Sequence, residues 1–214
     1  MMPLHALPSL LGREEPGRIY GVVVGIVTNN KDPKEMGRVK VKFPVLSEDY
    51  ESQWARVLTP MAGNNRGLYY LPEVDDEVIV AFENGIIEHP YVIGAVWNGK
   101  DKPPESNSDG HNNMRAFHSR SGHIVRLDDT AGAEKIEILD KTGNNKIVIT
   151  SSDNKIQISA QSDITIESTT GKLKLSANGI EITSMTDIKV QANTTLDMQS
   201  TGPASLKGAI VKIN

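Results

Sequence analysis

Apolar residues recur in pairs along the second half of the chain, with one residue between the two members of each pair. From Ile136 onward such a pair comes about every eight positions. Because successive side chains point to opposite faces of a strand, each pair places two apolar side chains on the same face. The pairs are Ile136/Ile138, Ile147/Ile149, Ile156/Ile158, Ile164/Ile166, Leu173/Leu175, Ile180/Ile182, Ile188/Val190, Leu196/Met198 and, more loosely spaced, Ile210/Ile213.

The residues between these pairs are mostly Ser, Thr, Asn, Gly, Asp and Lys, which are typical of turns and solvated strand faces. A repeat this short has only two or three apolar side chains, so it cannot bury them without stacking on neighbouring repeats. One chain that makes a strand per repeat also leaves its strand edges unpaired. The pattern therefore predicts a fibrous β-structure in residues 114–214 in which several chains pair with one another.

The first half of the chain has a different pattern. Residues 37–43 alternate Val39, Val41 and Phe43 with basic residues, as a half-buried strand does. Further strand-like segments are residues 19–28, 54–58, 77–82 and 90–96. Five or six short strands separated by turns, within about 80 residues, predict a small closed barrel. No segment has a good helical period, so we expect an all-β protein.

These patterns divide the chain into four parts. Residues 1–17 form a leader with three prolines and four leucines, which is either mobile or docks on a partner. Residues 18–98 form the barrel, and residues 99–113 form a linker without apolar side chains. Residues 114–214 form the repetitive region.

Composition narrows the classes of function. The chain has no Cys, which excludes disulfides and thiolate metal sites, and no apolar run long enough to span a membrane as a helix. Its N-terminus lacks the features of a signal peptide. Residues 1–111 have 11 basic and 16 acidic side chains, and residues 112–214 have 12 and 11. Neither half has the basic field expected of a nucleic-acid-binding protein.

Three groups of residues invite a chemical interpretation. His118 and His123 are spaced for a metal site, but they lie among arginines, and no carboxylate or thiol cluster completes the set. Asp128 and Asp129 could form the carboxylate pair of a glycosidase, although a turn explains them more simply. Such enzymes also need aromatic side chains to hold sugar rings, and only Phe117 lies in this half. We therefore expect no catalytic residues, no metal and no cofactor.

The basic strand at residues 37–43 is the third group. Lys34, Arg38, Lys40 and Lys42 could bind an oligonucleotide, as many OB-folds do, with the aromatic residues Trp54, Tyr69 and Tyr70. Alternating lysines are equally typical of a solvated strand face, and the net charge of residues 1–111 is −5. We therefore expect no nucleic-acid partner.

Several separated motifs resemble contractile-tail spike proteins. These proteins are the VgrG proteins of type VI secretion, the baseplate spikes of contractile phages and the spikes of extracellular contractile injection particles. The motifs of their OB-fold domain are Gly-Arg-Val-Lys-Val at 37–41, Trp-Ala-Arg-Val at 54–57, Leu-Pro-Glu-Val-Asp-Asp-Glu-Val at 71–78 and His-Pro-Tyr-Val-Ile-Gly at 89–94. Residues 121–132 resemble the entry to the family's β-helical needle, and residues 208–214 are similar to its tip.

The resemblance implies an OB-fold barrel of five strands followed by an intertwined triple-stranded β-helix. In such a homotrimeric needle the pairs from Ile136/Ile138 to Leu196/Met198 would meet on the three-fold axis. Each repeat would rise by about 4.8 Å, the spacing of neighbouring strands. Some phage needles bind an ion through a His-x-His motif, but no His follows His123 here, so we expect no such ion.

The resemblance also implies partners and a place in the cell. VgrG proteins have a large hub domain before the OB-fold, whereas only about 17 residues precede it here, so we expect the hub to be a separate protein. No lysozyme domain fits into the linker. The family's PAAR-repeat tip protein would bind at Ala209, Ile210, Val211, Lys212, Ile213 and Asn214.

We therefore expect a structural central spike, not an enzyme. It would assemble in the cytoplasm without a signal peptide, as part of a virion tail or injection particle, and would reach the target cell envelope. Two alternatives come from other classes. One is a trimeric carbohydrate-binding or depolymerising tail fibre, and the other is an OB-type nucleic-acid-binding module.

Overall fold

The computed structural model describes residues 17–47 and 50–212 of the chain. In this part the regular elements are β-strands, apart from one short 3-10 helix, η2 (Glu83–Gly85). The chain divides into two units, residues 1–161 and residues 162–214. The expected leader at 1–17 lies almost entirely outside the described residues.

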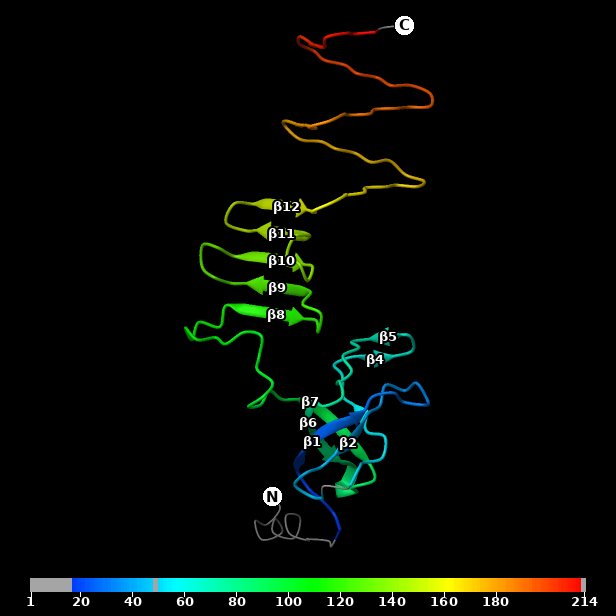
Figure 1. Cartoon of the computed structure of the whole chain (residues 1–214), viewed down its shortest axis with the longest axis vertical. Helices are drawn as coiled ribbons and strands as arrows, with labels where there is room; N and C mark the ends of the chain where they lie inside the picture. Colours follow the sequence, from blue (N-terminus) through cyan, green and yellow to red (C-terminus); the bar gives the residue numbers. More distant parts are fainter. Residues whose placement is uncertain (1–16, 48–49, 213–214) are drawn as a thin grey trace, which may run out of the picture. The chain divides into compact units, whose positions relative to one another are not determined.

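A five-stranded sheet, with order β2-β1-β6-β7-β3, forms the first half of the structure (Figure 1). The neighbouring pairs are antiparallel except for β3 and β7, which are parallel. Isolated bridges from Val39 to Ala55 and from Lys42 to Glu51 join the two edges, so the sheet curls into a closed barrel. The strands are β1 (Val22–Asn29), β2 (Lys40–Lys42), β3 (Arg56–Val57), β6 (Glu77–Phe82) and β7 (Pro90–Ala95). A separate small hairpin consists of β4 (Ala62–Gly63) and β5 (Arg66–Gly67).

The barrel encloses the hydrophobic core of the protein. The predicted buried face at residues 37–43 is confirmed, since Val39, Val41 and Phe43 are completely buried. A Cβ on Gly25 would lie 2.2 Å from a methyl group of Val41, so only glycine allows β1 and β2 to come this close. The other buried apolar residues are Val27, Ala55, Val78, Val80, Phe82 and Val92.

A second sheet contains the first of the apolar pairs. Its strands follow one another as an antiparallel meander, with order β12-β11-β10-β9-β8. The strands are β8 (Met114–His118), β9 (Ile124–Asp128), β10 (Lys135–Leu139), β11 (Lys146–Thr150) and β12 (Lys155–Ser159). The expectation that strands throughout residues 114–214 pair with other chains is therefore wrong for this sheet. Strands β9, β10 and β11 have both edges filled by neighbours from the same chain.

The hairpin turns explain this difference. The connections contain residues with a left-handed backbone, namely Gly122, Gly132, Gly143 and Asn154, with φ values between 51° and 96°. This conformation lets a short connection reverse the chain direction, and Gly and Asn adopt it at little cost. Each strand is therefore returned alongside the preceding one before it can meet another chain.

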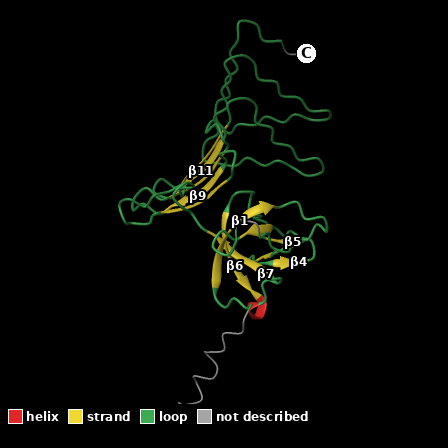
Figure 2. Cartoon of the chain, turned by 60° about the horizontal axis from the view of Figure 1, so that its bottom comes forward, coloured by secondary structure: helices red, strands yellow, loops and turns green. Residues whose placement is uncertain are grey.

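Residues 162–212 form no strand in the described part of the chain. They run as a series of extended passes separated by bends (Figures 1 and 2). Serine hydroxyl groups stabilise three of the bends, since Ser168, Ser184 and Ser200 accept hydrogen bonds from backbone N–H groups two or three residues further on, at 3.2–3.3 Å. Among the described residues, no backbone hydrogen bond joins one pass to the next.

Candidate interaction surfaces

The register of the second sheet places its apolar pairs on one face. Ile138 lies opposite Val125 on one side and Ile147 on the other, while Ile136 lies opposite Leu127 and Ile149. The side chains therefore form two columns that cross the sheet. One column consists of Phe117, Val125, Ile138, Ile147 and Ile158, and the other of Leu127, Ile136, Ile149 and Ile156.

Most of these columns stay exposed in the described part of the chain, although the ring of Tyr70 lies against Phe117, with 5.2 Å between the ring centroids. Ile147 and Ile149 lie on a central strand, yet they are 39% and 37% exposed, whereas Val41 in the barrel is fully buried. The face is hollowed into a depression of about 410 Å³ that Phe117, Ile138 and Ile158 help to line. A continuous exposed apolar surface of this kind marks a place where another surface binds.

The opposite face of the same sheet is polar and internally paired. Arg126 Nε donates to Glu137 Oε2 at 2.5 Å, and Lys135 Nζ lies 3.4 Å from Glu137 Oε1. Burial would raise the pKa of Glu137, but the hydrogen bond from Arg126 and the charges of Arg126 and Lys135 outweigh it and hold the pKa below its ordinary value. The charged groups at the centre of this face are paired with one another, so association through the sheet would use the apolar face.

The expected axis residues beyond Gln161 are more open than those of the inner strands β10 and β11. In a single chain they lie at the surface and not in a core, because the passes that contain them have no second layer of the same chain to pack against. One chain therefore does not bury the expected axis, and the place of these side chains on a three-fold axis stays a prediction. The residues are Ile164, Ile166, Leu173, Leu175, Ile180, Ile182, Ile188, Val190, Leu196 and Met198.

The two members of each of these pairs are not equally exposed. The second member is the more open in every pair, with exposed fractions of 67% for Ile166 and Leu175, 66% for Val190 and 85% for Met198. The first members are between 54% and 59% exposed. Both members thus have a large apolar surface left for a partner.

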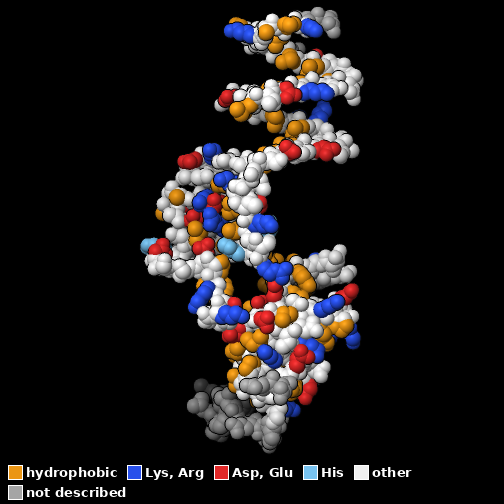
Figure 3. Space-filling model, viewed as in Figure 1, with side chains coloured by type: hydrophobic (Ala, Val, Ile, Leu, Met, Phe, Trp, Pro, Cys, Tyr) orange, Lys and Arg blue, Asp and Glu red, His pale blue; other side chains and the backbone are white. Residues whose placement is uncertain are grey.

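The space-filling view shows apolar side chains along the successive passes (Figure 3). Leu206, with Ala204, continues the spacing of eight, and sequence reasoning missed this further pair because Ala contributes little apolar surface. Ile210 of the expected tip is 79% exposed. Ile213 and Asn214 lie outside the described residues.

The carboxylates considered as glycosidase residues serve the hairpin turns instead. Asp128 accepts hydrogen bonds from the Thr130 hydroxyl group at 2.6 Å and from the Thr130 backbone N–H at 3.0 Å, and these bonds lower its pKa. Asp129 pairs with Arg115 at 3.1 Å. The general acid of a glycosidase needs a raised pKa, because it must be protonated at working pH. The lowered pKa of Asp128 argues against that role.

The two histidines are not brought together as metal ligands. His123 Nδ1 accepts a hydrogen bond from the backbone N–H of Lys141 at 3.2 Å, which links two neighbouring turns. His118 Nε2 lies 3.8 Å from Glu105 Oε1. No group of three or more His, Asp or Glu side chains within residues 17–47 and 50–212 is arranged to hold a metal ion.

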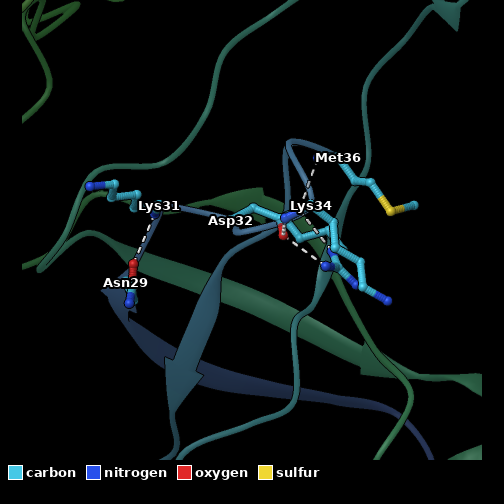
Figure 4. A network of polar contacts seen from close by, with 6 residues as sticks. Asn29, Lys31, Asp32, Lys34 and Met36 are labelled. Carbon is cyan, nitrogen blue, oxygen red and sulfur yellow. Dashed lines mark hydrogen bonds and ion pairs between the residues drawn. The ribbon is translucent and has the colours of Figure 1, made fainter.

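A network of hydrogen bonds around Asp32 fixes the loop between β1 and β2 (Figure 4). Its carboxylate accepts bonds from Arg38 Nε and Nη2 at 2.8 and 2.7 Å, and from the backbone N–H groups of Lys34 and Met36 at 3.0 Å. The hydrogen bonds from Arg38 are the main reason that the pKa of Asp32 lies far below its ordinary range. Sequence reasoning missed this network, although Asp-Pro followed by a basic residue is a turn signal.

Two of the four cations that an oligonucleotide would need are already paired with carboxylates. Arg38 is paired with Asp32, and Lys40 Nζ lies 2.6 Å from Glu51 Oε2. Both cations lie over the ring of Trp54, each 5.8 Å from the ring centroid. A base could stack on Trp54 only by displacing these contacts.

Comparisons with known proteins agree with the barrel and extend beyond it. Residues 23–97 match the family model of the type VI secretion system/phage-baseplate injector OB domain. The chain is similar to the type VI secretion system spike protein VgrG1a of Pseudomonas aeruginosa, with 30% identity over 162 residues, which are 69% of this chain and 24% of that protein. It is also 31% identical to VgrG3 of Vibrio cholerae over 129 residues, 56% of this chain and 13% of that protein.

These relatives are much longer than the chain. It spans about a quarter or less of the length of the curated relatives that it matches. None of the helices in the part of the chain that the structure describes is long and apolar enough to cross a membrane.

Proposed function

We propose that this chain, which is a VgrG-like member of the baseplate spike family, forms the central needle of a contractile injection machine. The observation that supports the proposal is the row of apolar pairs, which is exposed from the second sheet to Val211 although its spacing is regular. One chain alone leaves this row in water. Burying this row between chains would gain about 25 cal/mol of free energy per Å² of apolar surface and would drive the chains together.

Three copies would satisfy both parts of the row. In the second sheet, three copies would turn their apolar faces toward a common axis and form a prism with polar outer walls. In residues 162–212, each pass would find strand partners from the other two chains, which would supply the missing backbone hydrogen bonds. Intertwining would thus be confined to the segment beyond Gln161, which is shorter than the segment expected from the sequence.

A needle of this kind is suited to bearing a load. Backbone hydrogen bonds between chains at every level make bending costly, since deforming one level breaks contacts in all three chains. When a sheath contracts, such a needle would concentrate the force on a small area of the target envelope. A separate hub protein would hold the barrel end, and a PAAR-repeat protein would bind residues 209–214.

The mass of the purified chain tests the trimer. Multi-angle light scattering should give three times the chain mass, and far-UV circular dichroism should show more β-structure than the strands of one chain account for. A monomer with the same β-signal contradicts the proposal. In negative-stain images of particles that contain a labelled chain, the label should lie at the centre of the baseplate.

The tip is tested by removing residues 208–214. The shortened chain should still form a trimer with the same melting temperature, because the deletion removes only the last, loosely spaced pair. It should lose binding of a co-expressed PAAR-repeat protein in a pull-down. Undiminished binding would place the partner elsewhere.

A further inference from the structure

The middle residue of each apolar pair lies on the polar side of the strand, and these middle residues form a column of their own. In the second sheet, Arg126 lies between Val125 and Leu127, and Glu137 lies between Ile136 and Ile138. The register places Arg126 directly opposite Glu137, and the two form the ion pair at 2.5 Å. Neighbouring repeats can therefore be joined by charges at this position as well as by apolar contacts.

The same position alternates in charge along residues 162–212. The middle residues of four successive pairs, from Leu173/Leu175 to Leu196/Met198, are Lys174, Glu181, Lys189 and Asp197. Positions two residues earlier carry Asp163 and then Lys172 in consecutive repeats, which are also of opposite sign. In these columns no two consecutive repeats carry the same sign.

Within the described part of one chain, these charged side chains form no ion pairs. The passes of residues 162–212 are not paired with one another, and no side chain of that segment takes part in an ion pair in the structure as described. Opposite charges in successive repeats would matter only where those repeats lie side by side. That condition is met between chains.

The geometry of three intertwined chains supplies the contact. If each chain moves to the next face of a triangular prism with each pass, then one face is built from all three chains in turn. A given repeat of one chain then lies between the preceding repeat of one partner and the following repeat of the other. Lys174 of one chain would therefore lie beside Glu181 of another, and Glu181 beside Lys189 of a third.

We infer that Lys174, Glu181, Lys189 and Asp197 form ion-pair columns between chains, which fix the register in which a second and a third copy of this chain wind around the first. The apolar pairs cannot fix that register, because one pair of Ile or Leu residues resembles the next. A slip by one repeat would leave the apolar contacts nearly unchanged but would bring Lys174 beside Lys189 or another Lys174. The alternating charges therefore penalise slipped assemblies. The inference rests on the proposed trimer.

Two complementary variants test whether the charges act between chains. A cationic variant, Glu181→Lys with Asp197→Lys, has four positive charges in the column, and an anionic variant, Lys174→Glu with Lys189→Glu, has four negative charges. Each alone should form trimers that melt about 5 °C or more below the wild type, since every contact in the column becomes repulsive. The deficit should shrink in 1 M NaCl, where the Debye length is about 3 Å.

Co-expression of the two variants with different affinity tags then separates contacts between chains from contacts within one. Trimers purified through both tags should recover most of the lost melting temperature, because chains of opposite charge now alternate in part. The matched control is Glu167→Lys with Asp187→Lys, which makes the same change in charge at positions whose neighbours in the column, Ser159, Ser176, Gly179 and Thr195, are uncharged. It should melt near the wild-type temperature.

The other outcomes overturn the inference in distinguishable ways. Two destabilised variants that do not rescue each other would place the ion pairs within one chain. Variants that melt as the control does would show that the charges do not meet at all. A wild-type chain that is monomeric by light scattering would refute the proposed needle itself, and the ion-pair columns with it.

Discussion

The second sheet and residues 162–212 have the same pattern of apolar pairs, yet only the first pairs with itself. In the sheet, every strand is bonded to its neighbours along the chain. In residues 162–212, the described passes have no strand partner. The pattern of side chains decides which face is apolar, and something else must decide which chain supplies the neighbouring strand.

The length of the connection is what differs. The first members of successive pairs are 11 residues apart from Val125 to Ile136 and again to Ile147, and 9 apart to Ile156. Beyond Gln161 the spacing falls to about eight. A strand of five residues then leaves two or three residues for most bends, fewer than the four to six that close these hairpins. The step from Ile164 to Leu173, with a spacing of nine, is the exception. In the proposed trimer, the strand that follows a short bend would pair with a different chain.

The largest expected effect comes from a charge on the proposed axis beyond Gln161. Ile180→Asp would bring three carboxylates together in a dry interior, and an uncompensated buried charge costs several kcal/mol. We expect the trimer to be lost in light scattering, while the barrel keeps its own melting transition. If burial of the carboxylate on the axis causes the loss of the trimer, then an aspartate on the outward side of the next repeat should be tolerated.

Gln191→Asp supplies that control. Gln191 lies one residue beyond the pair Ile188/Val190, on the outward side, where a carboxylate stays in water. This variant should remain trimeric and should melt within about 2 °C of the wild type, as surface substitutions usually do. Equal effects of the two variants would show that the pairs have no common inward face.

A pair of glycines tests the difference in the connections. Gly143 has φ +72° in the β10–β11 turn, whereas Gly202 occupies a bend where no left-handed φ is required, and a Cβ would meet no atom within 4 Å at either position. Gly143→Ala should destabilise the second sheet by about 1–2 kcal/mol, because a side chain disfavours the left-handed conformation. Gly202→Ala should be neutral or stabilising by a few tenths of a kcal/mol.

Hydrogen exchange of the strand amides, together with the melting temperature, would measure both glycine variants. Faster exchange in β10 and β11 after Gly143→Ala is expected, with no local change after Gly202→Ala. Should Gly202→Ala be the more damaging of the two, the bends would be as demanding as the hairpin turns, and the account based on connection length would be wrong.

Sequence reasoning succeeded where one physical signal dominated. The alternation of Val39, Val41 and Phe43 with basic residues sufficed to predict a strand with one buried face, and the apolar pairs sufficed to predict the apolar face of β10 and β11. It failed at the β8–β12 meander because the spacings of 11 and 9 were averaged with the later spacing of eight. The left-handed Gly132 and Gly143 were a usable signal for hairpins.

Other features could not be predicted from one sequence. The close approach of β1 and β2 at Gly25 depends on a register between distant segments, and so does the closure of the barrel by Val39 and Ala55. The bonds from Asp32 to Arg38 are closer in sequence, but they require the loop to adopt one conformation among many. The sequence of residues 162–212 predicts apolar pairs that the described part of the chain leaves uncovered, but it does not specify which surface covers them.

The smallest expected effect concerns the ion pair that one chain makes by itself. Glu137→Gln leaves an acceptor for Arg126 but removes the negative charge, so it should cost about 1 kcal/mol at pH 7, less than the roughly 1.5–3 kcal/mol of a whole hydrogen bond to a charged group. The pKa of Glu137 is lowered in the folded protein, so its contribution is fully present above the ordinary pKa of about 4.3 and is lost as the pH falls through the lowered value. The melting temperatures of wild type and variant should therefore converge as the pH falls below about 4.3.

Chain concentration separates this pair from the proposed ion-pair columns. Because Arg126 and Glu137 belong to the same chain, the effect of Glu137→Gln should not change when the protein is diluted, whereas the effects of the Lys174, Glu181, Lys189 and Asp197 variants should grow as trimers dissociate. Asp153→Asn, which removes a carboxylate of the β11–β12 turn, is the control for the loss of a negative charge and should melt near the wild-type temperature at pH 7. A dilution-dependent effect at Glu137 would mean that the second sheet, too, exchanges strands between chains.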